Sequence, residues 1–184
     1  MIRKNSAILR IIDELAAAGQ AGILPRKFTK GHLVIGQGTA VANVFFIRSG
    51  IVKCSFTEDG DKEYILEFLG EGQVLGEIEA ISGIPAISGV RAISDLSVYM
   101  FDKESFLHLL QRHAGLNAAI LQLMATRLAD TAQRSARQQL KPLEYSLAQL
   151  LQALEHEKLP CTKQDLANYL GVTLRSLNRL MKER

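Results

Sequence analysis

The chain has 184 residues, of which 47% are hydrophobic and 22% are charged, close to the averages of soluble folded proteins. This length suits one mid-sized domain or two small ones and excludes a large multidomain enzyme. The net charge is only +3, but residues 1–50 carry +5, residues 51–110 carry −7 and residues 111–184 carry +5. A basic C-terminal part favours a polyanionic partner, with ordinary variation of surface charge as the alternative.

No segment is typical of a membrane span or of a secretory signal. The longest stretch without a charge, residues 31–47, has 17 residues, and a bilayer span needs about 20 apolar ones. Charged residues interrupt the apolar positions around Ile11, where a signal peptide needs an unbroken apolar core. We therefore expect a cytoplasmic protein with no membrane partner, in which Cys54 and Cys161 are reduced.

A short amphipathic helix is predicted at the start of the chain, with Asn5 or Ser6 as its cap and Gly19 after its end. Its apolar positions have the spacing of one helix face: Ile8, Ile11, Ile12 and Leu15. Short β-rich runs separated by glycines follow, up to about residue 101. This pattern favours a β-sandwich or β-roll over alternating strands and helices.

One hairpin can be located within this part, with its turn at Glu58-Asp59-Gly60-Asp61. We predict that its two strands present alternate residues to one face: Val52, Cys54 and Phe56, then Tyr64, Leu66 and Phe68. A last strand alternates in the same way at Leu96, Val98 and Met100.

The pattern becomes helical from Lys103, and no glycine or proline interrupts the stretch from Leu116 to Lys141. One flank of this long helix is predicted to hold Leu116, Ile120, Leu123, Met124 and Leu128. A second apolar set widens the stripe: Leu121, Ala125, Ala129, Ala132 and Ala136. Because both sides need cover, we predict that one packs on the β-domain and the other on a partner helix, giving a homodimer through residues 113–140. Burial within one chain is the alternative.

Pro142 ends this helix, and leucines at helical spacing predict another before Pro160. Thr162-Lys163-Gln164-Asp165 then has the pattern of a capping box, and Gly171 separates its helix from a second one capped by Thr173. The core positions of this helix-turn-helix are Leu166, Ala167, Leu170, Val172, Leu177 and Leu180.

The opposite face of the second helix carries side chains that read base edges and bind phosphates in the major groove. We predict that double-stranded DNA is contacted by seven residues: Thr162, Thr173, Arg175, Ser176, Asn178, Arg179 and Lys182. A two-fold dimer would place two such helices one DNA turn apart. A helical hairpin whose basic residues only keep it soluble is the alternative.

Several motifs resemble the CRP/FNR superfamily of bacterial transcription regulators, with a YeiL-like branch as the nearest relative. They are Phe28-x-x-Gly31, Ile35-x-x-Gly38, Phe45-Phe46-Ile47-x-x-Gly50-x-Val52-Lys53, Gly76-Glu77-Ile78, Met124-Ala125-x-Arg127-Leu128 and the segment from Thr162 to Lys182. The resemblance implies an α+β fold: an N-terminal helix and an antiparallel β-roll (a double-stranded β-helix) of cyclic-nucleotide-binding type at residues 1–112, a dimerisation helix at 113–140 and a DNA-binding helix-turn-helix at 141–184. It leaves RNA polymerase open as a further partner.

The resemblance also implies a ligand pocket, formed by Gly76, Glu77, Ile87, Ser88 and Thr131. Relatives that bind cyclic AMP carry Arg-Ser about ten residues after the Gly-Glu pair, whereas this chain has Ile87-Ser88, and Ala132 stands where a serine is expected. A buried phosphate without a guanidinium would remain unpaired. We therefore predict no cyclic AMP and no cofactor, with an unknown effector. Glu77 is either structural or a receptor for another ligand.

Two further departures concern the DNA-binding end. The family's wing has no counterpart before Arg184, so the chain is truncated or works without one, and Leu174-Arg175 replaces the family's Arg-Glu, so the operator cannot be inherited. A ligand-binding or dimerisation module with a vestigial DNA-binding end is one alternative, and a cupin-like enzyme is another. The enzyme is disfavoured, with no catalytic or metal residues predicted, because no metal-ligand spacing joins His32, His108, His113 and His156.

Overall fold

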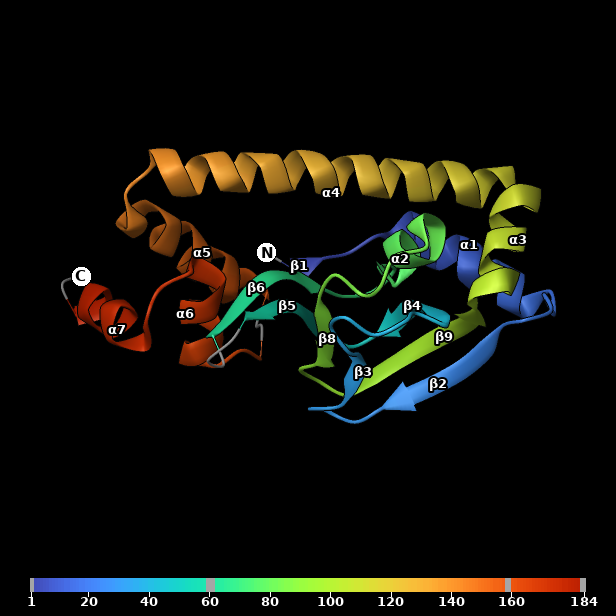
Figure 1. Cartoon of the computed structure of the whole chain (residues 1–184), viewed down its shortest axis with the longest axis horizontal. Helices are drawn as coiled ribbons and strands as arrows, with labels where there is room; N and C mark the ends of the chain where they lie inside the picture. The colour runs from blue at the N-terminus through green and yellow to red at the C-terminus, as the bar shows by residue number, and fades with distance from the viewer. Residues whose placement is uncertain (1, 59–61, 158–159, 183–184) are drawn as a thin grey trace.

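A computed structural model describes residues 2–58, 62–157 and 160–182. Its N-terminal part contains two sheets (Figure 1). One sheet has the strand order β1 (Ile2–Arg3), β6 (Lys62–Leu69), β5 (Val52–Glu58), β8 (Gly89–Ala92) and β3 (Leu33–Ile35). The other has the order β2 (Leu24–Phe28), β9 (Leu96–Asp102), β4 (Asn43–Ser49) and β7 (Val74–Leu75). The predicted α+β class and antiparallel roll are confirmed, with one addition: β1 pairs with β6 in parallel.

Seven helices lie among and after these strands in the described part of the chain. They are α1 (Ser6–Ala17), α2 (Glu77–Ser82), α3 (Lys103–Arg112), α4 (Ala114–Leu140), α5 (Leu143–Glu157), α6 (Lys163–Leu170) and α7 (Leu174–Lys182). Asn5 caps α1, since its Oδ1 accepts a hydrogen bond from the Ile8 amide at 3.0 Å. Figure 1 shows α4 extending along the molecule, from α3 at one end to the C-terminal helices at the other. No described helix is long and apolar enough to cross a membrane.

Strand β9 is central because both of its faces are covered. Tyr99 and Phe101 pack on one side in a core that α1, α3 and α4 complete. Leu96 and Val98 are buried on the other side, between the sheets. The predicted alternation along this strand therefore gives the correct inward residues, and the helices add a second buried face.

The β5–β6 hairpin departs from the predicted alternation. The register shifts between Cys54 and Ser55, and Phe56 is 37% exposed, so its predicted inward position is wrong. On β6 the fully buried side chains are Ile65, Phe68 and Leu69. Because Cys54 pairs with Glu67 and Ser55 with Ile65, the extra residue of this β-bulge is Leu66 of β6. The alternation of β6 is reversed beyond it, so Leu66 packs between the sheets and Phe68 packs on the opposite side, contrary to the prediction. Phe56 lies beyond Ser55, the last residue of β5 that pairs with β8. The predicted turn residues Asp59, Gly60 and Asp61 lie outside the described residues.

Helix α4 uses its flanks differently from the prediction. Leu116, Ile120 and Leu123 are buried against the roll, but Leu128, assigned to the same flank, is 73% exposed. Arg127 takes the next inward position instead. At about 100° per residue, position 127 continues the stripe of 116, 120 and 123, whereas position 128 is turned away from it.

Candidate nucleic-acid interface and ligand pocket

The predicted helix-turn-helix is built as its sequence pattern indicates. The Asp165 amide donates to Thr162 Oγ1 at 3.1 Å, and the Thr162 amide donates to Asp165 Oδ2 at 2.9 Å, which completes the capping box of α6. Gly171 ends α6 with φ +71°, in the left-handed region that favours glycine. Thr173 caps α7, since its Oγ1 accepts from the Ser176 amide at 3.1 Å. Leucines and an alanine join α5, α6 and α7 in one core: Leu147, Leu150, Leu166, Ala167, Leu170, Leu177 and Leu180.

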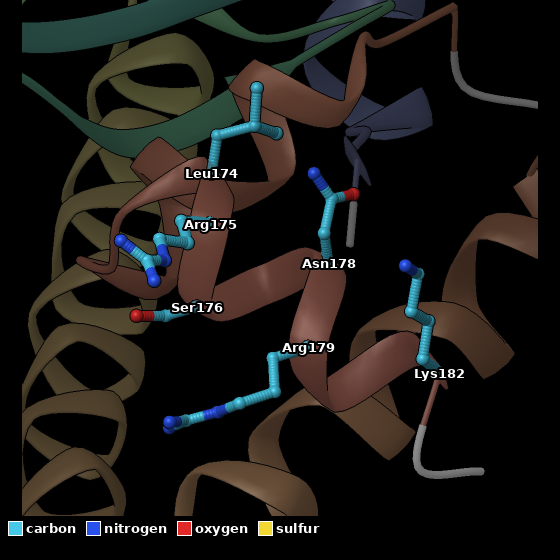
Figure 2. A pocket seen from close by; sticks show the side chains of 6 residues that line it. All are labelled: Leu174, Arg175, Ser176, Asn178, Arg179 and Lys182. Carbon is cyan, nitrogen blue, oxygen red and sulfur yellow. The ribbon is translucent and has the colours of Figure 1, made fainter.

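The outer face of α7 holds five of the seven residues predicted to contact DNA. With Leu174 they line an open hollow: Arg175, Ser176, Asn178, Arg179 and Lys182. Figure 2 shows Arg175, Ser176 and Arg179 pointing to one side of α7, and Asn178 and Lys182 diverging from them. Neither arginine has an ion-pair partner among the residues that the structure describes. Both arginines are exposed on this face.

The two predicted threonines lie at helix ends rather than on this face. The Thr162 hydroxyl donates to Asp165 Oδ2 at 2.8 Å, and the Thr173 hydroxyl donates to Ser176 Oγ at 3.0 Å. Each hydroxyl therefore already serves a cap. Their positions at the first turns of α6 and α7 are those where helix N-termini approach phosphates.

The predicted pocket contains an arginine to which the sequence analysis gave no role. Glu77 is 1% exposed, and its Oε1 lies 2.5 Å from Arg127 Nη1 of α4. Arg127 Nε and Nη2 also donate to Gln73 Oε1, at 3.2 and 2.7 Å, and Nη2 donates to the Val74 carbonyl at 3.1 Å. Burial raises the pKa of Glu77, and the charge of Arg127 opposes this. The pair favours the structural role for Glu77.

The missed role had a signal in the sequence. Position 127 continues the spacing of Leu116, Ile120 and Leu123, which predicts an inward side chain, and a buried arginine requires an acidic partner. The spacing could not identify Glu77 as that partner, because the two residues are 50 positions apart.

The other predicted pocket residues have varied surroundings. Gly76 is buried with φ +82°, and a Cβ there would lie 3.0 Å from the Asn43 carbonyl oxygen. Ser88 is half-buried, whereas Ile87 is 43% exposed. Thr131 is exposed on α4, one turn beyond Arg127, and no hydrogen bond joins it to Glu77 among the described residues. The structure thus brings together Gly76, Glu77 and Arg127, and the full ligand set remains a prediction.

A line of exposed apolar residues follows the side of α4 that faces away from the roll. Leu121 is 62% and Leu128 is 73% exposed. With three exposed alanines they form a seam at intervals of three and four residues: Ala118, Leu121, Ala125, Leu128 and Ala132. This spacing is that of a helix that pairs with another helix, and alanines allow close approach.

The chain was compared with protein families and with curated proteins. Residues 25–113 match the cyclic nucleotide-binding domain family. No curated protein matches the sequence.

Solved structures with the same fold cover nearly the whole chain. The c-di-GMP-responsive global regulator CLP of Xanthomonas campestris has a TM-score of 0.79 and 20% identity, over 93% of this chain and 90% of that chain. A protein of Eubacterium rectale assigned to the CRP/FNR family of transcriptional regulators has a TM-score of 0.74 and 17% identity, over 97% and 82%. The catabolite activator protein of Thermus thermophilus has a TM-score of 0.60 and 20% identity, over 92% and 82%.

Proposed function

We propose that this protein is a sequence-specific DNA-binding transcription regulator, because residues 25–113 match the cyclic nucleotide-binding domain family and nearly the whole chain is similar in fold to solved regulators, one of them of the CRP/FNR family. The resemblance to that superfamily is confirmed, and the YeiL-like branch stays a prediction. The outer face of α7 is the observation that carries the proposal. It presents polar and basic side chains outward while Leu177 and Leu180 hold the helix in its core.

This face has the chemistry of a major-groove reader. Arg175 and Arg179 lie one helical turn apart, and each can donate two hydrogen bonds to a guanine edge. Asn178 can pair with an adenine edge, and Lys182 supplies a positive charge for a phosphate. Both arginines are exposed and line the open hollow, so DNA can reach them.

We propose that the regulator is a homodimer through the exposed seam of α4. The roll covers one side of α4 with Leu116, Ile120 and Leu123, and the seam leaves an apolar line on the far side. In a two-fold dimer, the seam of one protomer packs against the same seam of its partner. Each apolar contact therefore occurs in two copies, and both protomers bury apolar area. The pairing delivers two copies of α7 to one DNA duplex.

Replacing Leu128 by aspartate is expected to separate the dimer into monomers. The change removes the burial of two leucines and brings two carboxylates together, so the dimer dissociation constant should rise about 10³-fold. Sedimentation equilibrium measures it. Thr126→Asp is the matched control, since Thr126 is exposed on α4 outside the seam. Equal dissociation constants for the two variants would show that the seam is not the interface.

Selection from a random duplex library, followed by titration at several salt concentrations, tests DNA binding directly. A DNA-binding regulator enriches one sequence, and the logarithm of its affinity falls with the logarithm of salt concentration by about 0.9 per phosphate contact. Absence of both results would favour the alternative, a ligand-binding or dimerisation module with a vestigial DNA-binding end.

The Arg127 guanidinium is already neutralised by Glu77, so a cyclic phosphate in the pocket would have to break that buried pair. Cyclic AMP therefore remains an expected non-ligand. A role for RNA polymerase and a cytoplasmic location also stay predictions. Within the proposal, residues 1–112 sense, residues 113–140 dimerise and residues 141–184 bind DNA.

A further inference from the structure

Helix α6 lies on the outer face of the β-roll, and a lysine of the roll joins the two. Lys53 Nζ on β5 lies 2.7 Å from Asp165 Oδ1 of α6 and 2.9 Å from Glu63 Oε2 of β6. Asn168 Nδ2, one turn further along α6, donates to the same Glu63 oxygen at 2.8 Å. The side chains of Lys53 and Asp165 are only 12% and 11% exposed, so water screens their attraction weakly.

Asp165 serves two structures at once through its two oxygens. Oδ2 closes the capping box with Thr162, and Oδ1 accepts from Lys53. The residue that begins the first helix of the helix-turn-helix therefore also binds it to the roll. Loss of Lys53 would leave the cap intact, which separates docking from the folding of α6.

Apolar and aromatic contacts surround this charged cluster. Ile65, Phe68 and Ile93 of the roll pack with Tyr169 and the half-buried Cys161 of the C-terminal part. The rings of Phe68 and Tyr169 have centroids 5.7 Å apart.

Arg134 of α4 completes the junction. Its Nη2 donates to the Tyr169 carbonyl at 2.7 Å and to the Ile65 carbonyl at 3.0 Å, and its Cζ lies 4.0 Å from the centre of the Tyr169 ring. A single guanidinium of α4 thus contacts both β6 and α6.

We propose that Lys53, Glu63, Asp165 and Asn168 form a latch that fixes the orientation of α6 and α7 on the β-roll. The docked face belongs to α6, whereas the outward side chains of α7 line an open hollow. The latch therefore positions α7, the helix proposed to contact DNA, and leaves its outer face uncovered. Docking itself is independent of DNA, and its effect on DNA affinity rests on the proposed function.

The charges that form the latch are present throughout the neutral pH range. Burial alone would lower the pKa of Lys53, but the hydrogen bonds of Asp165 and Glu63 reverse this and leave it raised. Burial opposes ionisation of the two carboxyls, yet Lys53 holds the pKa of each below its ordinary value. Ionised Glu63 and Asp165 contribute their full stabilisation of the folded protein above their ordinary pKa values. This contribution is lost as the pH falls through the lowered pKa values of the folded state. The contribution of Lys53 is lost only as the pH rises through its raised pKa.

Cys161 provides a built-in reporter of docking, measured without DNA. It is half-buried at the junction, and burial, followed by the charge of Asp165, raises the pKa of its thiol. Cys54 is buried inside the roll and reports the integrity of that domain. A disulfide reagent such as DTNB should react with Cys161 about tenfold faster in Lys53→Met than in the parent, since the thiol is reached mainly from the undocked state. Cys54 should stay unreactive.

Two control variants accompany this measurement. Lys53→Arg keeps the charge and should retain slow reaction, and Lys27→Met removes one exposed lysine of the roll away from α6 and should behave as the parent. If Cys54 reacts in the Lys53→Met variant, the roll of that variant is unfolded. The Glu63→Gln variant is then used in its place, and the same faster reaction of Cys161 is expected. Parent-like rates at Cys161 in a folded latch variant would overturn the proposal.

A second arm measures DNA affinity for the same variants. Affinity for the selected operator should fall about tenfold in Lys53→Met. In this variant the helix-turn-helix of each protomer is less firmly docked, and both must be ordered when DNA binds. Binding to random duplex should change less than about twofold, since it depends on phosphate contacts. Faster Cys161 reaction with unchanged operator affinity would refute the positioning role. A parent that binds no DNA would refute the proposed function, while the Cys161 arm would still decide whether the latch exists.

Discussion

Arg127→Met is expected to destabilise the protein by about 3–5 kcal/mol, because it leaves the buried Glu77 carboxylate without its partner. In the parent, the guanidinium contacts Glu77 at 2.5 Å and also donates to Gln73 and Val74. The substitution removes all of these bonds within the same buried site, and methionine fills only part of the volume. Urea unfolding at neutral pH, followed by circular dichroism, measures the change in the free energy of unfolding.

The double variant Glu77→Met with Arg127→Met separates loss of the charge pair from loss of packing. Replacing both members of a buried ion pair with apolar residues is often neutral, so the double variant should recover much of the stability lost in the single one. Arg127→Lys keeps a charge but loses the forked geometry and should fall between them. A single variant as stable as the parent would show that Glu77 has no need of Arg127.

Arg175→Ala combined with Arg179→Ala is expected to abolish specific recognition of the selected operator. Each bidentate contact with a base is worth about 1–3 kcal/mol, and a dimer loses it in both half-sites. Both side chains are exposed on the outer face of α7, so stability should change little. Fluorescence anisotropy with operator and random duplexes measures the specificity ratio, and footprinting locates the site.

Arg112→Ala is the matched control for this experiment. Arg112 is an exposed arginine at the end of α3, which lies at the opposite end of the molecule from α7 (Figure 1). It should bind operator like the parent. If the double variant footprints as the parent does, the outer face of α7 does not read the DNA.

One face of α4 contacts both the predicted ligand pocket and the helix-turn-helix formed by α6 and α7. Its inward stripe is apolar at Leu116, Ile120 and Leu123, and becomes charged at Arg127 and Arg134. Arg127 reaches the buried Glu77, and Arg134, about 10 Å further along the helix, reaches α6. One rigid element therefore contacts the proposed sensing domain and the proposed DNA-binding domain.

Local features of the fold could be predicted from the sequence because they depend on neighbours within a few positions. The caps at Asn5 and Thr162, the break at Pro142 and the left-handed turn at Gly171 each follow from the chemistry of one short segment. The outward face of α7 follows as well, since a helix whose leucines are buried at regular spacing must turn its other residues outward.

Only the tertiary structure decided which distant residues meet. Lys53 and Asp165 are 112 positions apart, and Arg127 and Glu77 are 50 apart, so no local spacing relates them. The bulge at Leu66 of β6 placed Leu66 and Phe68 on opposite faces, although their spacing predicts one face, because one extra residue reverses the side of every later residue in a strand. Leu128 was misplaced for a related reason: a helix apolar on two sides does not reveal which side its own domain covers. Composition and periodicity determined which groups need partners, and packing determined which partners they have.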